Sequence, residues 1–182
     1  MAAIWFMRLS AAICLAAIVA VLVVVGRDWY REAANDSALA AAHLHINSLG
    51  GSLSQDAVDS SFIVSLRDSA VTDAQIEELV ALLRPLATGS SPAPDVPRMF
   101  AFNLAGTQVG DQGLLAISSL PVMWLNLNGT RITDQGLLHL RDQRQLSIVT
   151  ISGTEVTRPG INAMRDSLPQ VWVPVSDRGH PR

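Results

Sequence analysis

The sequence lacks residues that several common functional sites require. It has no lysine, so all thirteen basic residues are arginine and the phosphate-binding loop ending in Gly-Lys-Ser/Thr is absent. Its one cysteine, Cys14, lies in an apolar run, which excludes a disulfide framework, a CxxC redox centre and a thiolate zinc site. The formal net charge of -3 provides no basic field for sequence-independent nucleic-acid binding. We therefore expect no nucleic-acid partner, no cofactor and no metal.

The N-terminal segment, residues 1–31, has the properties of a membrane anchor. An uncharged run, Leu9–Val25, lies between Arg8 and Arg27. As a helix rising about 1.5 Å per residue, this run is just long enough to cross a bilayer. Trp5 and Trp29 lie where the two membrane interfaces would be, as in an aromatic belt. The segment is predicted to be a single transmembrane helix.

A cleaved signal peptide is the alternative interpretation, because the apolar run is short and follows an arginine. Three valines end the run, however, and the nearest Ala-x-Ala pattern, Ala38–Ala40, lies about a dozen residues too far downstream. The arginine counts on the two sides are nearly equal. Since a short N-terminus usually stays inside, we expect a protein in the cell membrane whose C-terminal domain lies outside the cytoplasm.

The rest of the chain is organised by an internal repeat. FNLAGTQVGDQGLL begins at Phe102, LNLNGTRITDQGLL follows 23 residues later at Leu125, and VTISGTEVTRPGI follows after 24 more at Val149. An earlier copy, VSLRDSAVTDAQI, begins at Val64. It lies 38 residues before the second copy, so about fifteen extra residues must loop out. Residues 87–97 (ATGSSPAPDVP) have the proline, glycine and serine content of such a loop.

Each copy predicts one strand, one turn and one helix. An apolar-x-apolar triplet at period two is typical of a short strand. Gly-Thr turns the chain, Thr-Asp or Asp alone begins a helix, and leucines supply the buried stripe of that helix. One branched residue per copy is expected to point back into the core; these residues are Val71, Val109, Ile132 and Val156. The predicted fold class is α/β.

At these residues the sequence resembles the leucine-rich repeat family, in the bacterial variant L-x-L-x-G-T-x-I-T-D-x-G-L, which is similar to the repeats of F-box-type proteins. The resemblance covers residues 61–175. It implies a short solenoid of about four strand-helix units with a parallel sheet, which binds another macromolecule, usually a protein. It implies neither catalysis nor a bound cofactor. The sequence departs from the family in its few copies, in the long insertion and in lacking an asparagine or cysteine ladder. Thr107, Thr130 and Thr154 occupy positions for an equivalent hydroxyl ladder.

Both ends of such a stack need covers. Residues 32–60 are predicted to hold a linker and a capping helix over residues 38–49, with an apolar stripe at Leu39, Ala42, Ile46 and Leu49 and a stop at Gly50-Gly51. At the far end, residues 169–175 are predicted to form a capping strand, whose Pro174 blunts the open edge. Residues 176–182 are predicted to be a tail.

The outward positions of the strands are the candidate protein-binding face. The candidate residues are Arg67, Asn103, Trp124, Asn126, Asn128 and Thr150. A tryptophan among small polar residues is a plausible interface anchor. The alternative is that Trp124 packs against Ile148 and Trp172 as an ordinary cross-strand ladder. His43 and His45 are expected to diverge on a helix, which argues against a metal site.

The sequence therefore predicts a membrane-anchored, non-enzymatic leucine-rich repeat module that mediates protein-protein interaction. The alternative is a structural, scaffold or self-associating subunit at the membrane, which would make the chain a homo-oligomer. The insertion at residues 87–97 supports a separate hypothesis, in which it projects as a recognition loop.

Overall fold

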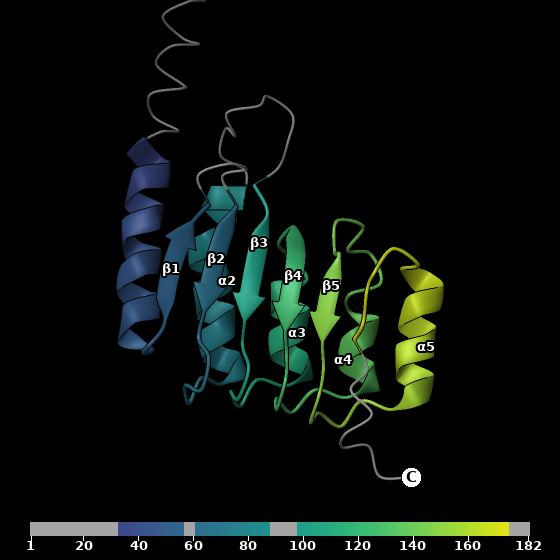
Figure 1. Ribbon diagram of the computed structural model, residues 1–182. Helices are drawn as coiled ribbons and strands as arrows, with labels where there is room; N and C mark the ends of the chain where they lie inside the picture. Colours follow the sequence, from purple (N-terminus) through teal and green to yellow (C-terminus); the bar gives the residue numbers. More distant parts are fainter. Residues whose placement is uncertain (1–32, 57–60, 88–97, 175–182) are drawn as a thin grey trace, which may run out of the picture. The chain divides into compact units, whose positions relative to one another are not determined.

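The computed structural model describes residues 33–56, 61–87 and 98–174, and the chain divides into two compact units, Met1–Ser37 and Ala38–Arg182. The first described helix covers residues 33–48, of which residues 38–48 belong to the second unit, and all of the other elements below belong to the second unit. The strands are β1 (Ser52–Gln55), β2 (Phe62–Ser65), β3 (Phe100–Asn103), β4 (Val122–Asn126) and β5 (Ile148–Thr150), and the labelled helices are α2 (Asp73–Ala87), α3 (Asp111–Ile117), α4 (Asp134–Leu138) and α5 (Arg158–Ser167) (Figure 1).

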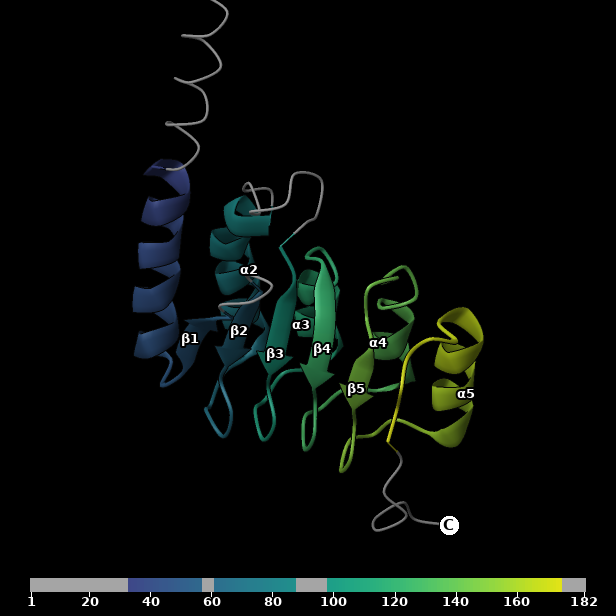
Figure 2. The ribbon, with the colours of Figure 1, turned by 45° about the horizontal axis from the view of Figure 1, so that its top comes forward.

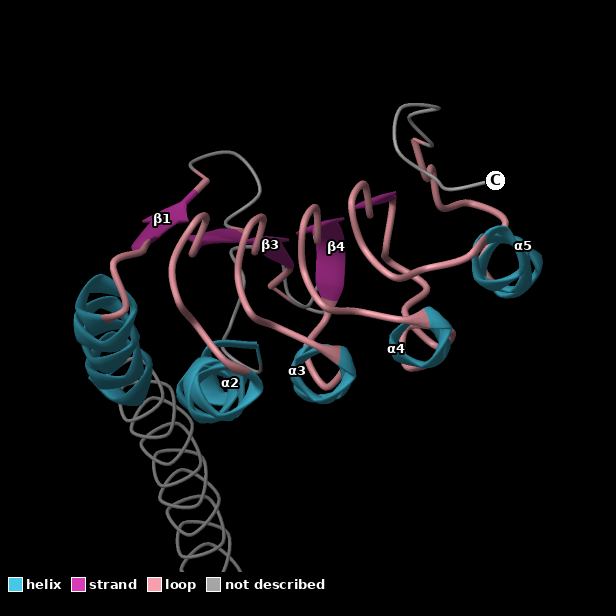
Figure 3. Cartoon of the chain, turned by 90° about the horizontal axis from the view of Figure 1, so that it is seen from below, coloured by secondary structure: helices cyan, strands magenta, loops and turns pink. Residues whose placement is uncertain are grey.

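The five strands form one sheet in chain order, from β1 to β5. β1 pairs antiparallel with β2, whereas β2, β3, β4 and β5 pair parallel. Each parallel strand returns to the same direction through a connection that contains a helix, and these helices lie on one side of the sheet (Figures 2 and 3). The predicted α/β class with a mostly parallel sheet is confirmed, and the other side of the sheet carries no described helix.

The core lies between the sheet and the helices. Alternate strand residues are fully buried, and the rings of Phe62 and Phe100 stack with centroids 5.5 Å apart, with Phe102 next in line at 6.1 Å. The four branched residues predicted to point inward are all buried, with at most 3% exposed: Val71, Val109, Ile132 and Val156. The strand-turn-helix reading of each copy is thus confirmed.

Each of the parallel strands, β2 to β5, ends in a turn whose second residue has a left-handed backbone. Gly106, Gly129 and Gly153 have φ of +73°, +68° and +72°. The residue at this place in the first copy is Asp68, with φ +57°, a conformation that aspartate tolerates better than most side chains. The N–H of Gly106 donates to the carbonyl of Asn128 at 2.8 Å, so these turns also join one copy to the next.

The N-terminal cover agrees with the predicted helix and adds a strand. Ala42 and Ile46 are fully buried, Leu39 and Leu49 pack against the core, and Gly50 follows with φ +77°. The sequence analysis did not predict β1, because its segment SLSQ has a single buried residue, Leu53, and so shows no alternating pattern.

The C-terminal cover is shorter than predicted. In place of a strand over residues 169–175, the described part of this segment makes one parallel bridge, between Ile148 and Trp172. The N–H of Trp172 donates to the carbonyl of Ser147 at 2.8 Å, and the N–H of Val149 donates to the carbonyl of Trp172 at 3.1 Å. Pro169 and Pro174 have no N–H to donate, which limits further pairing.

The insertion begins later than predicted. Ala87 is the last residue of α2, which has 15 residues against 7 in α3 and 5 in α4, so part of the extra length in the first copy is helix. Residues 88–97 lie outside the described residues, as do residues 1–32, where the membrane anchor is predicted, and the tail. Within the described ranges, we find no helix that is both long and apolar enough to cross a membrane.

Candidate functional site

The side of the sheet away from the helices, here called the open face, carries the predicted binding residues. Strand pairing in register brings one outward residue of each strand into a row across the sheet. The first row, here called the apolar row, consists of Ile63, Ala101, Trp124, Ile148 and Trp172. No described helix lies over this row (Figure 3), and all of its side chains except that of Ala101 are half-buried or exposed.

Exposure within the apolar row is greatest at its two ends. The exposed fraction is 63% for Trp172 and 37% for Ile63, whereas Trp124 and Ile148 are half-buried. Ala101 lies in the same row, but it is only 7% exposed because it is small and has larger neighbours on both sides in the row. The row thus has half-buried side chains at its centre and exposed side chains at its two ends.

A β-bulge in β4 helps to place Trp124. The register between β3 and β4 shifts after the first pair, so Phe100 pairs with Val122 but Ala101 pairs with Trp124. The extra residue, Met123, allows Val122 and Leu125 both to be buried while Trp124 stays on the open face. Sequence alternation alone did not indicate this irregularity.

The second row, here called the polar row, consists of Ser65, Asn103, Asn126 and Thr150. Beyond it, in the turns, come Arg67, Ala105, Asn128 and Ser152. Most of these side chains are half-buried. The structure therefore brings Asn103, Trp124, Asn126 and Thr150 together on neighbouring strands, with Arg67 and Asn128 at the edge, as predicted.

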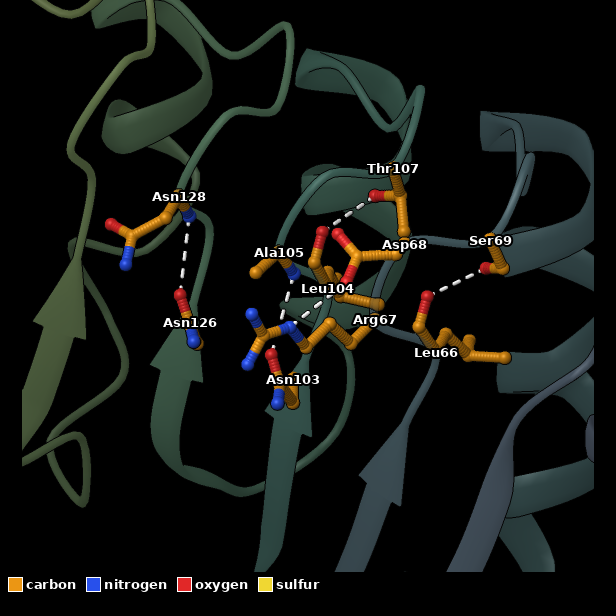
Figure 4. Close-up of polar contacts among 10 residues, drawn as sticks. All are labelled: Leu66, Arg67, Asp68, Ser69, Asn103, Leu104, Ala105, Thr107, Asn126 and Asn128. Carbon is orange, nitrogen blue, oxygen red and sulfur yellow. Dashed lines mark hydrogen bonds and ion pairs between the residues drawn. The ribbon is translucent and has the colours of Figure 1, made fainter.

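The asparagines of the open face use their side-chain oxygens internally (Figure 4). Asn103 Oδ1 accepts from the N–H of Ala105 at 3.4 Å, and Asn126 Oδ1 accepts from the N–H of Asn128 at 3.2 Å. Asn126 Oδ1 also accepts from the hydroxyl of Thr150 at 2.8 Å. Such bonds from a side chain to the backbone two residues on stabilise turns.

Asn128 continues the pattern, since its Oδ1 accepts from the N–H of Ser152 at 2.7 Å. Because a backbone N–H can only donate, the side-chain atom that it bonds in Asn103, Asn126 and Asn128 is the amide oxygen. The second terminal atom of each side chain is therefore the amide nitrogen. Within the described residues these amide nitrogens donate no hydrogen bond. The open face therefore offers three amide N–H groups as donors, while each of the side-chain oxygens already accepts at least one hydrogen bond.

Among the described strand and turn residues of the open face, charge is confined to one exposed pair. Arg67 Nε lies 3.0 Å from Asp68 Oδ2, and the two side chains are 66% and 70% exposed. A pair this exposed contributes about 1 kcal/mol or less. The face is otherwise uncharged along its strands, which suits a neutral partner.

Two residues of the apolar row, Trp172 and Ile63, were missed as site residues. The sequence analysis named Trp172 only as a packing partner of Trp124, although the two align at a spacing of 48. The structure places both on one row, joined through Ile148. The sequence did contain a signal for this row: Trp124 and Trp172 are separated by two repeat lengths and so occupy equivalent positions in the repeat.

The recurring Asp-x-Gly has a structural role that the sequence analysis also missed. Asp111 Oδ1 accepts from the N–H of Thr133 at 2.8 Å, and its Oδ2 accepts from the hydroxyl of Thr133 at 2.7 Å. Asp134 makes the same two bonds with Thr157, at 2.7 and 2.6 Å. In the first copy Asp73 accepts from the N–H of Gly110 at 2.6 Å. These contacts, here called the aspartate junctions, each join one unit to the next.

The glycine of each Asp-x-Gly makes room for the aspartate of the preceding unit. A Cβ on Gly113 would lie 2.6 Å from Asp73 Oδ1, and a Cβ on Gly136 or Gly160 would meet the carboxylate of the preceding unit in the same way. Thr133 caps its helix, as expected, by accepting from Gln135 N, and Thr157 caps α5 by accepting from Gly160 N. The cap expected from Asp111 is wrong: α3 begins after Gly110 without a side-chain cap bond, because the Asp111 carboxylate bonds to Thr133 of the next unit. The glycines and aspartates therefore belong to packing between units and not to phosphate binding.

The threonines expected to form a hydroxyl ladder bond within their own unit. The hydroxyls of Thr107, Thr130 and Thr154 donate to the carbonyl three residues earlier, at 2.7, 2.6 and 2.8 Å. They close the turn after each strand, and the backbone bonds described above, not these hydroxyls, run between units.

On the helix side, α2 and α3 border an open groove of about 740 Å³. Asp73, Glu77 and Arg84 line it together with the half-exposed Leu115, and Arg84 donates to the hydroxyl of Ser119 at 3.3 Å. In the part of the chain that the structure describes, no group of three or more His, Cys, Asp or Glu side chains is arranged to hold a metal.

No family model and no curated protein matches the chain.

Proposed function

We propose that the protein is a membrane-anchored leucine-rich repeat module, built as a short solenoid, that binds another protein through the open face and has no enzymatic activity. The observation that carries the proposal is the apolar row, with Trp172 63% exposed and Ile63 37% exposed on a sheet face that no described helix covers. Aromatic residues that keep large exposed surfaces are the side chains that most often dominate binding energy at interfaces.

The repeat assignment is supported by the equivalence of successive units. Units 23 and 24 residues apart repeat the left-handed glycine, the hydroxyl-closed turn and the aspartate junction with nearly the same distances. A repeated unit that cannot bury its apolar side alone is stabilised by stacking on its neighbours. Such stacks leave one face of the sheet as a continuous surface for a partner.

The anchor is supported by the uncharged run at Leu9–Val25, which the sequence places between Arg8 and Arg27. Protease treatment of intact and permeabilised spheroplasts tests both the anchor and its orientation. We expect digestion of the C-terminal domain in intact spheroplasts, with residues 1–31 retained in the membrane. Protection until permeabilisation would place the domain in the cytoplasm and redirect the search for a partner.

Binding by the open face is tested by photo-crosslinking in cells that produce the full-length chain. A photoreactive phenylalanine analogue replaces Trp172 in one variant, and Leu138 in a matched control. Leu138 is a comparably accessible apolar residue, 45% exposed, on the helix side of the same unit stack. We expect a discrete heavier adduct from position 172 and none from position 138.

The mass of the adduct separates the two functions considered from sequence. An adduct that contains a different protein supports the binding module. An adduct of twice the mass of the chain supports the self-associating subunit. No adduct from position 172, or equal adducts from both positions, would contradict binding by the open face.

A further inference from the structure

The spacing of the two tryptophans on the apolar row is set by the sheet. Trp124 pairs with Ile148, and Ile148 pairs with Trp172, so the tryptophans are two strand positions apart. Neighbouring strands are about 4.8 Å apart, which separates the two tryptophan backbones by about 9.6 Å. A ligand that lies across the strands meets an aromatic side chain at this interval, with a branched aliphatic side chain, Ile148, between the two.

A polyproline II helix has nearly the same interval. It repeats every three residues with a rise of about 3.1 Å per residue, or about 9.3 Å per turn. An extended β-strand presents side chains on one side about every 6.7 Å, which does not match two strand positions. The apolar row thus suits a ligand that places every third residue against a tryptophan.

The polar row supplies the hydrogen bonding that such a ligand needs. The oxygens of Asn103 and Asn126 are occupied, and their amide N–H groups remain as donors. A polyproline II backbone makes no internal hydrogen bonds, so its carbonyl oxygens are free to accept. The near absence of charge on the open face also fits an uncharged segment.

From this match we propose that the open face binds a proline-rich segment of a partner protein in the polyproline II conformation. The segment lies across β3, β4, β5 and the bridge at Trp172, with its prolines on Trp124 and Trp172. This inference rests on the proposed protein-binding function and names the kind of segment bound. Aromatic-lined surfaces bind such segments at low entropic cost, because the ligand is already extended.

The test measures binding of fluorescein-labelled decaproline to the full-length protein in mild detergent, by fluorescence anisotropy. A Gly-Ser decapeptide of the same length is the control ligand. We expect saturable binding of decaproline only. Trp172→Ala should weaken it at least about tenfold, and Leu138→Ala, on the helix side, should leave it unchanged.

A second variant tests the donors separately from the tryptophans. Asn126→Asp keeps an oxygen for the N–H of Asn128 and for the hydroxyl of Thr150, but replaces the amide donor by an acceptor. We expect an unchanged melting temperature and decaproline binding weakened about three- to tenfold. An unchanged melting temperature together with unchanged affinity would contradict the proposed carbonyl contact.

Other outcomes overturn the proposal and point elsewhere. Lack of decaproline binding would refute it, and so would equal binding by wild type and Trp172→Ala. Saturable binding of chitohexaose in place of decaproline would identify a glycan site. Concentration-dependent dimerisation lost in Trp172→Ala would identify a second copy as the occupant. If position 172 still crosslinks to another protein while decaproline does not bind, only the choice of ligand fails; if neither occurs, the protein-binding function fails too.

Discussion

The aspartate junctions and the open face belong to the same units, but they use their polar side chains differently. At the junctions both carboxylate oxygens of Asp111 and Asp134 accept hydrogen bonds from the next unit. On the open face each asparagine uses its oxygen and leaves its amide nitrogen without a described partner. Satisfied polar groups stabilise a fold, whereas amide N–H groups beside exposed aromatic residues are available to a ligand. The contacts that stabilise the stack and the proposed binding face therefore lie in two regions of the repeat.

The largest loss of stability is expected at a junction glycine, Gly113. Alanine is normally favoured over glycine within a helix by about 1 kcal/mol. Here its Cβ would lie 2.6 Å from Asp73 Oδ1 and 2.7 Å from a methyl group of Val109. We expect Gly113→Ala to lower the free energy of unfolding by about 2–3 kcal/mol, as measured by urea denaturation. Gln112→Ala, at the exposed neighbour in the same helix, should change it by less than about 0.5 kcal/mol. A stabilised Gly113→Ala variant would show that the junction is not tightly packed.

Removing a junction carboxylate should have the next largest effect. Asp111→Ala leaves the N–H and the hydroxyl of Thr133 without their acceptors, and we expect it to cost about 2 kcal/mol. The matched control is Asp142→Ala. The Asp142 side chain is 91% exposed, and its ion pair with Arg141, at 3.6 Å, is long and exposed to solvent. That control should change stability by less than about 0.5 kcal/mol. Similar melting temperatures for the two variants would argue against a structural role for the junctions.

A smaller effect is expected from the turn hydroxyls. Thr130 is 4% exposed, and its hydroxyl donates to the carbonyl of Leu127 at 2.6 Å. Thr130→Val keeps the shape and removes this bond, so we expect a loss of about 1 kcal/mol by chemical denaturation. Thr107→Val, at the equivalent place one unit earlier, should cost a similar amount. Clearly different costs at the two positions would contradict the equivalence of the units.

The smallest effects on stability are expected on the open face, where the two tryptophans should also differ. Trp124 is half-buried between Ala101 and Ile148, so Trp124→Ala should cost about 1 kcal/mol through lost cross-strand packing. Trp172, 63% exposed, should change stability by less than about 0.5 kcal/mol when replaced by alanine. Thermal melting of both variants tests this. A large loss for Trp172→Ala would favour the packing ladder over the binding anchor at that position.

The repeat made much of the fold predictable. Period-two triplets, Gly-Thr turns and the inward residues at Val71, Val109, Ile132 and Val156 recur at fixed spacing, so independent copies support one another. β1 has one apolar residue and no copy elsewhere in the chain, and it was missed. The capping strand was overestimated, because alignment with Pro121–Leu127 indicated a strand while Pro169 and Pro174 restrict its pairing.

The candidate site was predictable in position but not in its hydrogen bonding. Alternation along the strands placed Asn103, Trp124, Asn126 and Thr150 on one face. It did not show which atoms of the asparagines are occupied, because these bonds join neighbouring turns and strands. For the same reason the role of Asp-x-Gly between units was missed: Asp111 and Thr133 meet only once two units are stacked. Contacts between units depend on the geometry of the stack, which the sequence pattern does not contain.

The separation of binding from stability is tested most directly by photo-crosslinking at positions 172 and 138 of the full-length chain, together with the same experiment in an Asp111→Ala background. The account predicts an adduct from position 172 and none from position 138. It also predicts that the adduct persists in the Asp111→Ala variant at temperatures below its lowered melting point. An adduct from position 138 without one from position 172 would contradict the account, since it would place the binding surface on the helices.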